Sequence, residues 1–292
     1  MNPPVLPVTR FAPSPTGKLH LGHAFSAIQA HDRARAEGGR FLLRIEDIDG
    51  ARSRPEHVAT IEADLRWLGL EWDGPVLFQS TRLEVYAAAL ERLRGMGLLY
   101  PCFCTRAEIA ASLSAPHGVE GIYPGTCRAL SEGERAARVA AGVPYAWRLD
   151  VAEAVAYLED PEVLLWHDEI AGDVIADPLS AGDVVLARKD APASYHLAVT
   201  LDDAAQGITH VVRGVDLFAA THVHRLLQAL LDLPTPIYRH HALLTGADGE
   251  RLAKRHGAPT LESVRLRGDD GRALADLLRN GALPIGFGHA NA

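Results

Sequence analysis

The sequence has few cysteines, no long apolar run and no excess of basic residues. Only Cys102, Cys104 and Cys127 occur among its 292 residues, and an odd number cannot close a framework of disulfides. No apolar segment reaches the ~18 residues of a membrane-spanning helix, and the start, MNPPVLPVTR, lacks the basic and apolar regions of a secretion signal. We therefore expect a cytoplasmic protein with reduced cysteines and no membrane contact.

The charge balance excludes a protein that binds polyanions over its whole surface. Lys and Arg number 29 against 37 Asp and Glu, which gives a formal net charge of −8. Any contact with nucleic acid must therefore be a local patch. With 48% hydrophobic and 23% charged residues, the composition is that of a globular protein. The length suggests two domains at ~150 residues each.

Apolar runs of strand length alternate with amphipathic segments of helical length in the first hundred residues. The runs VLPVTRF and RFLLRI predict strands, and the segments 19–38 and 55–70 repeat apolar residues at helical spacing. Such alternation predicts an α/β fold on a parallel sheet, with ligands at the carboxyl ends of the strands.

The pattern changes after residue 100. Residues 101–190 are rich in Gly, Pro and short β-like stretches and predict an inserted domain that carries all three cysteines. Residues 1–100 and 191–235 are then expected to form the two halves of the parallel sheet. Residues 236–292 contain a polar, glycine-flanked loop and a short helical tail.

Two motifs favour a substrate that carries phosphate. His20 and His23 flank a predicted helix start, where backbone N–H groups and two imidazoles can donate to a phosphoryl group, and Gly22 leaves room for a base. Lys254, in the polar loop, can neutralise a departing pyrophosphate. Each motif alone also has a structural interpretation: the first could be a helix start that happens to be rich in His, and the second a solvated basic loop. Together they favour nucleotide chemistry.

Several motifs in one order resemble the catalytic domain of class I glutamyl-tRNA synthetases. They are RFAPSPTG at 10–17, HLGH at 20–23, RIEDID at 44–49, Tyr195, and HVVRGVD at 210–216. The resemblance covers roughly residues 8–260 and implies a Rossmann-like catalytic domain with an inserted zinc-bearing domain. Within the family the chain most resembles the short paralogues, which attach glutamate to the queuosine base in the anticodon of tRNA(Asp).

The segment after Lys254 supports the short form. It has only 38 residues, fewer than the ~50 of an independent domain, so we expect no anticodon-binding domain of the full-length kind. The loop also departs from the family pattern Lys-Met-Ser-Lys-Ser. The stretch Arg251–Arg255 keeps the second lysine as Lys254 and lacks both serines. We expect the chain to act as a monomer.

The resemblance implies a two-step, ATP-dependent ligase reaction. Glutamate attacks the α-phosphate of ATP, assisted by Mg²⁺, and gives glutamyl-adenylate without needing tRNA. A hydroxyl of queuosine then accepts the glutamyl group. His20, His23 and Lys254 are the expected catalytic residues, and together with Gly22 they form the expected ATP site.

A site selective for glutamate needs donors for two carboxylates and an anion for one ammonium. The sequence offers Arg10, Glu46 and Arg213 at the ends of predicted strands, and the phenol of Tyr195 as a further donor. The resemblance implies that these four residues and Ser14 bind glutamate, with Glu46 on the ammonium and the arginines on the carboxylates. Each charge alone also fits a structural ion pair.

The cysteines predict one structural zinc ion. Thiolates are good zinc ligands, and three of them leave a fourth position open. The resemblance implies Tyr123, which completes the set Cys102, Cys104, Tyr123 and Cys127. Residue chemistry alone favours His117, since imidazole binds zinc more readily than phenol. The alternative is a reduced cluster without metal.

Three other functions remain open from the sequence. A truncated glutamyl-tRNA synthetase would charge the 3′ end of tRNA(Glu). A nucleotidylyltransferase with a His-x-Gly-His turn would leave Arg10, Glu46, Tyr195 and Arg213 unexplained. A zinc-dependent RNA-binding module would leave both phosphate motifs unused. The remaining histidines that we interpret as helix-face or core residues are His31, His57, His196, His222 and His224.

Overall fold

The first half of the chain forms three parallel strands with helices between them. The computed structural model describes residues 6–105, 107–109, 122–158, 164–244 and 259–282. Strand β2 (Arg40–Ile45) pairs in parallel with β1 (Val8–Phe11) on one side and β3 (Leu77–Phe78) on the other. Helix α1 (Leu21–Arg35) follows β1, and α2 (Pro55–Trp67) follows β2 and begins with a proline, which suits a first helical turn. The predicted strand and helix alternation is confirmed.

A second group of strands comes from the later part of the chain. Strand β10 (Ile237–His241) pairs in parallel with β9 (His210–Gly214) and β6 (Leu165–Asp168), and β7 (Gly172–Ile175) is antiparallel to β6 at the edge. Both β6 and β7 belong to the stretch 101–190 yet join this sheet.

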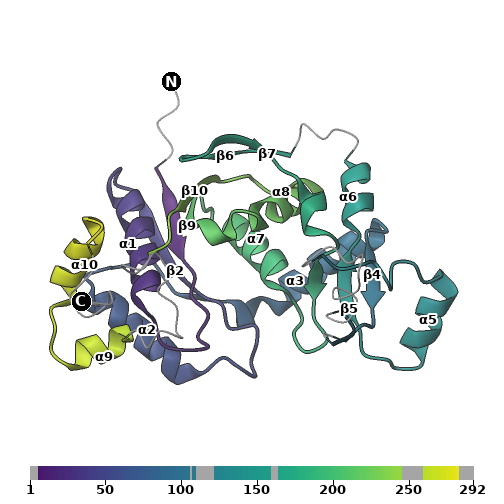
Figure 1. Cartoon of the computed structure of the whole chain (residues 1–292), viewed down its shortest axis with the longest axis horizontal. Helices are drawn as coiled ribbons and strands as arrows, with labels where there is room; N and C mark the ends of the chain where they lie inside the picture. Colours follow the sequence, from purple (N-terminus) through teal and green to yellow (C-terminus); the bar gives the residue numbers. More distant parts are fainter. Residues whose placement is uncertain (1–5, 106, 110–121, 159–163, 245–258, 283–292) are drawn as a thin grey trace, which may run out of the picture.

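Hydrogen bonds between β1 and the residue before β9 join the two groups. The N–H of Val8 donates to the Thr209 hydroxyl at 2.7 Å, and the N–H of Thr209 donates to the Val8 carbonyl at 3.0 Å. The two groups of strands therefore lie side by side in the middle of the molecule (Figure 1). This arrangement confirms the predicted α/β fold with a parallel sheet.

Apolar side chains cover both faces of the joined sheet. Successive side chains of a strand point to opposite faces, so Leu42 packs in one buried cluster while Phe41 and Leu43 pack in the other. The first cluster includes residues of α7 (Tyr195–Ala205) and α8 (Ala220–Leu230). The second contains residues of α1 and α2 together with α9 (Leu261–Leu266) and α10 (Gly271–Arg279).

A separate antiparallel sheet lies at the opposite end of the molecule from α10 (Figure 1). Its central strand β5 (Ala146–Leu149) pairs with β4 (Leu99–Cys102) and β8 (Val185–Ala187). The helices of this end are α3 (Leu83–Gly95), α5 (Glu132–Ala140) and α6 (Val151–Tyr157). Cys102 is the last residue of β4, so this sheet positions one member of the cysteine cluster.

Close packing between α10 and α2 generates a stability prediction. A Cβ added at Gly271 would lie 2.2 Å from the Trp67 carbonyl oxygen, a backbone atom that cannot move aside easily. We expect Gly271→Ala to lower the free energy of unfolding by about 1–3 kcal/mol in urea titrations. Gly133→Ala in α5 is the matched control, since nothing lies within 4 Å of its added Cβ. It should stabilise by about 0.5–1 kcal/mol; equal effects at both sites would contradict this packing.

Candidate active site

One cavity of about 620 Å³ opens at the carboxyl ends of the parallel strands. Arg10 lies in β1, Glu46 directly follows β2 and Arg213 lies in β9, and all three line this cavity. Tyr195, the first residue of α7, and Ser14, in the loop after β1, line it as well. The fold thus brings together the five residues expected to bind glutamate, although they span some two hundred positions in the sequence.

The turn from His20 to His23 lines the same cavity. Helix α1 begins at Leu21, so His20 is its N-cap residue, as the sequence predicts. The backbone N–H of His20 donates to Nδ1 of His23 at 3.1 Å. Because Nδ1 accepts, a neutral His23 ring carries its proton on Nε2 and can donate from there. Gly22 also lines the cavity, and a Cβ at that position would meet nothing within 4 Å.

The remaining expected phosphate ligand, Lys254, lies outside the described residues, as does the loop Arg251–Arg255. Leu243 and Leu244, which follow β10 and are the last described residues before this gap, line the cavity.

Arg10 is held by a carboxylate that sequence reasoning missed. Asp203 of α7 accepts from Nε and Nη2 of Arg10 at 3.0 and 3.3 Å, and from Nη1 of Arg44 at 2.8 Å. Burial raises the pKa of Asp203, but the two guanidinium groups outweigh it and hold the pKa below its ordinary value. One indication of this buried ion pair was present in the sequence: Asp202 and Asp203 are adjacent acids within the otherwise apolar stretch YHLAVTLDDAA.

The pKa of Glu46 shifts in the opposite direction to that of Asp203. Its side chain is 13% exposed, and the closest approach to Arg44 is 3.9 Å, between Oε1 and Nη2. Burial raises the pKa of Glu46 to about 7, against the opposing attraction of Arg44 and Arg10. A cation in the cavity would restore the charged carboxylate, because opposite charge favours ionisation.

Arg213 is buried, with 4% of its surface exposed, and touches the cavity. Its Nη1 donates to the Tyr195 hydroxyl at 3.1 Å. Within the described ranges no carboxylate forms an ion pair with this guanidinium. Burying a charge without a counter-charge is unfavourable. The cavity is therefore suited to an anionic group beside Arg213 and Tyr195.

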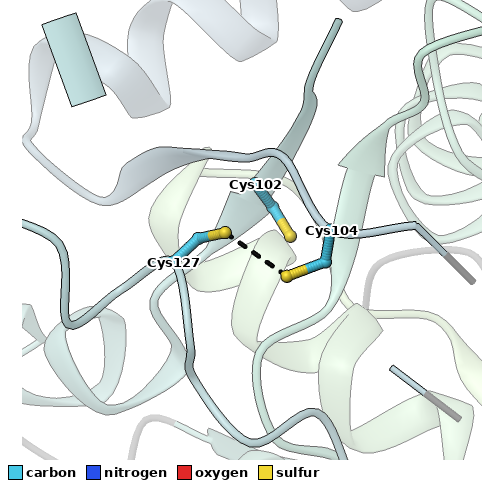
Figure 2. Close-up of side chains that lie close together, drawn as sticks. All are labelled: Cys102, Cys104 and Cys127. Atoms are coloured by element: carbon cyan, nitrogen blue, oxygen red, sulfur yellow. Dashed lines mark hydrogen bonds between the residues drawn. The ribbon is translucent and has the colours of Figure 1, made fainter. Parts of the chain in front are cut away.

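The three cysteines converge at the end of β4, as Figure 2 shows. Their sulfur atoms all lie within 4.8 Å of one another, and Sγ of Cys104 lies 3.4 Å from Sγ of Cys127. The Tyr123 hydroxyl lies 3.4 Å from Sγ of Cys102 and 3.5 Å from Sγ of Cys104. His117 lies outside the described residues. The expected set of four side chains is thus gathered in one place, apart from the cavity.

Comparison with known proteins gives the family. Residues 7–287 match the model of the catalytic domain of class I tRNA synthetases of the E and Q type. The glutamyl-Q tRNA(Asp) synthetase of Rhodobacter capsulatus is 52% identical over 269 residues, which cover 89% of this chain and 95% of that protein. The chain belongs to the glutamyl-Q tRNA(Asp) synthetase family. It is accordingly a member of the ATP-dependent tRNA ligases, as the sequence motifs predicted.

Other relatives agree with this assignment. The glutamyl-Q tRNA(Asp) synthetases of Symbiobacterium thermophilum and Nocardia farcinica are 49% and 48% identical and cover 89% and 92% of this chain, and the matches span 81% and 82% of those proteins.

Solved structures support the fold. The glutamate-tRNA synthetase of Elizabethkingia anophelis superposes with a TM-score of 0.74 at 30% identity, over 86% of this chain and 53% of that one. A glutamate tRNA ligase of Elizabethkingia meningosepticum, solved in complex with its amino acid, gives a TM-score of 0.72 at 30% identity and covers 87% and 53%. This chain therefore spans about half the length of these two proteins. Over the described ranges, no helix has the length and apolar character needed to cross a membrane.

Proposed function

We propose that this chain activates glutamate with ATP and transfers it to the queuosine base in the anticodon of tRNA(Asp). The observation that carries the first step is the uncompensated buried charge of Arg213 in a cavity that also contains Arg10 and Glu46. Two guanidinium groups fit the two carboxylates of glutamate, and one carboxylate fits its ammonium.

Tyr195 and Arg213 form one edge of the proposed amino-acid site. The Tyr195 hydroxyl accepts from Nη1 of Arg213, so its own proton points to another acceptor. The Tyr195 hydroxyl can therefore donate a hydrogen bond to a carboxylate oxygen in the cavity. Arg10 donates to Asp203 through Nε and Nη2, which leaves Nη1 for a second carboxylate.

ATP is proposed to bind beside this site at the start of α1. The helix N-terminus provides backbone N–H groups, Gly22 gives an open wall, and His23 can donate from Nε2. His20, His23 and Lys254 then stabilise the charge that develops as pyrophosphate leaves, and Mg²⁺ bound to ATP adds further positive charge. The glutamate carboxylate attacks the α-phosphate, so no protein nucleophile is required.

The names of the relatives support the RNA substrate, tRNA(Asp) that carries queuosine. A queuosine hydroxyl attacks the acyl carbon of the adenylate and releases AMP. The other candidate, a synthetase that charges tRNA(Glu), differs in the acceptor, which is a 3′ terminal adenosine.

The first prediction concerns amino-acid activation without RNA. We expect glutamate-dependent exchange of labelled pyrophosphate into ATP with no tRNA present, because the expected glutamate residues and the turn at His20 and His23 line one cavity without any RNA. Aspartate and glutamine are the controls: aspartate is one methylene shorter and glutamine lacks the second carboxylate. Lys254→Ala should abolish most of the exchange.

Three outcomes distinguish the alternatives. Exchange that begins only when tRNA(Glu) is added would favour the conventional synthetase. Exchange with any amino acid would contradict the proposed glutamate site. Absence of exchange under every condition would overturn activation itself, and labelling of queuosine-containing tRNA(Asp) tests the second step.

A second prediction follows from Glu46. Only its ionised form can neutralise the substrate ammonium, so kcat/KM for glutamate should rise as pH increases through about 7 and level off above it. Below that pKa we expect a fall of about tenfold per pH unit. Initial rates of exchange at saturating ATP measure this profile.

Glu46→Gln is the control for this titration. It keeps the size of the side chain and removes its charge, so it should weaken glutamate binding and abolish the step near neutral pH. An identical profile in both proteins would assign the titration to another group, such as His20 or His23.

We also propose that the cysteine cluster holds one structural zinc ion. Zinc–thiolate bonds of about 2.3 Å in a tetrahedron separate neighbouring sulfurs by about 3.8 Å, which fits sulfur atoms within 4.8 Å of one another. Cys102, Cys104 and Cys127 are three ligands and Tyr123 is the fourth. The guanidinium carbon of Arg148 lies 3.8 Å from the centre of the Tyr123 ring, a cation–π contact that orients the phenol. Burial and the neighbouring thiols raise the pKa of Tyr123, so zinc would have to displace the phenol proton when it binds.

The third functional prediction tests this set. We expect about one zinc per chain by elemental analysis, and a loss of zinc affinity of about tenfold or more in Tyr123→Phe, measured by competition with a chelator. His117→Ala is the matched control and should keep its zinc. Retention in Tyr123→Phe with loss in His117→Ala would assign the fourth position to the imidazole.

A further inference from the structure

Arg213 uses its whole guanidinium in a network of neutral acceptors. An arginine has five N–H groups in a fixed plane. In this chain they donate to His240 Nε2 (3.1 Å), the Tyr195 hydroxyl (3.1 Å), His224 Nδ1 (3.4 Å), the Leu217 carbonyl (3.1 Å) and Thr221 Oγ1 (2.6 Å). The plane of the guanidinium is therefore determined by the protein before any ligand enters.

His240 supplies the contact on the side away from Tyr195. It lies in β10, is 3% exposed, and its Nδ1 is 2.7 Å from Oδ2 of Asp168 in β6. The Nε–H of Arg213 can only donate, so Nε2 of His240 must accept. The ring proton is then on Nδ1, where the Asp168 carboxylate accepts it. Asp168 thus selects the one tautomer of His240 that can bind Arg213.

The charge states agree with this geometry. Burial and the charge of Arg213 lower the pKa of His240 to about 4, against the opposing effect of Asp168. The ring is therefore neutral at neutral pH and keeps Nε2 as an acceptor. Burial, with Arg213 and neighbouring histidines adding to it, holds the pKa of His224 well below its ordinary value, so this ring can also accept from Arg213.

The network orients Arg213 without neutralising its charge. Asp203 contacts Arg10 directly, whereas Asp168 lies one imidazole away from Arg213. A carboxylate in direct contact with Arg213 would neutralise its charge and so weaken its attraction for an anionic substrate. An imidazole between them orients the guanidinium and leaves its positive charge for a ligand.

We propose that His240, held by Asp168, is a positioning residue that fixes Arg213 and Tyr195 for one carboxylate of the amino-acid substrate, an inference that rests on the glutamate binding proposed above. His240 touches neither the cavity nor the substrate. We expect its effect to be on amino-acid binding and not on ATP binding, because its side chain bonds to Arg213, Thr221 and Asp168 and not to the turn at His20 and His23.

The test substitutes His240 and leaves Asp168 unchanged. Asp168 also accepts from the N–H groups of Ile170 and Ala171, so its loss would disturb the turn after β6 as well. His240→Leu removes the acceptor for Arg213. His240→Gln can return an acceptor oxygen near the position of Nε2. The matched control is His222→Gln in α8, since His222 packs against Phe218 as His240 does, and its Nδ1 accepts from the N–H of Asp177.

Pyrophosphate exchange gives separate KM values for glutamate and ATP. We expect His240→Leu to raise the glutamate KM by about 10- to 100-fold, the usual effect of losing a hydrogen bond to a charged group, with the ATP KM within about twofold of the wild-type value. His240→Gln should recover much of this loss, and His222→Gln should match the wild type. Thermal unfolding of each variant checks that the fold is retained.

Nitrogen NMR of the wild-type imidazoles provides a readout that needs no activity. His240, assigned by comparison with His240→Gln, should carry its proton on Nδ1 and none on Nε2. A proton on Nε2, an unchanged glutamate KM in His240→Leu, or equal increases in both KM values would overturn the positioning role. Lack of exchange in the wild-type chain would contradict the proposed function instead, and the spectrum would still decide whether His240 can accept from Arg213.

Discussion

The buried carboxylate of Asp203 connects helix α7 to the first group of strands. It lies in α7 and accepts from Arg10 and Arg44, which precede it by 193 and 159 residues in β1 and β2. Each of these charges would be strongly unfavourable in the interior without the others, so the three groups stabilise one another only in this arrangement. The position of Arg10 in the cavity depends on this ion pair, as does the placement of α7, whose first residue is Tyr195.

The charges around the cavity match the ligand that the proposed function requires. Of the charged side chains that line the cavity, Arg10, Lys18 and Arg213 are positive, whereas ionised Glu46 and Asp216 are negative. One positive charge is left over. Glutamate, with two carboxylates and one ammonium, carries a net charge of −1 and completes the balance. A neutral amino acid such as glutamine would leave a buried guanidinium uncompensated, which gives a physical basis for selectivity between the two.

Local patterns in the sequence predicted the strands and helices of the first hundred residues, and the resemblance to the synthetase family identified which charged residues at the strand ends to expect in the cavity. Arg10, Glu46 and Arg213 follow or end apolar runs, and parallel strands bring such positions to one edge. Asp203 was missed because an ion pair across 193 residues leaves no local pattern. The pairing of β6 with β10 was equally hidden, since a four-residue strand whose exposed and buried residues alternate gives no indication of its partner. Lys254 stays a prediction, because it lies outside the described residues.

The cysteine cluster and the cavity are distant in the sequence but connected by short contacts. Lys189 donates to the carbonyl oxygens of Phe103 and Cys104 at 2.7 and 3.2 Å, and so ties the cysteine loop to the segment that leads into α7. The N–H of Ser194 donates to the Leu186 carbonyl of β8, which fixes the residue directly before Tyr195. If the cluster binds the proposed zinc ion, a more rigid cysteine loop would also restrict the segment before α7 through Lys189. Through Tyr195, a structural metal would influence how precisely the substrate carboxylate is held, without taking part in the chemistry.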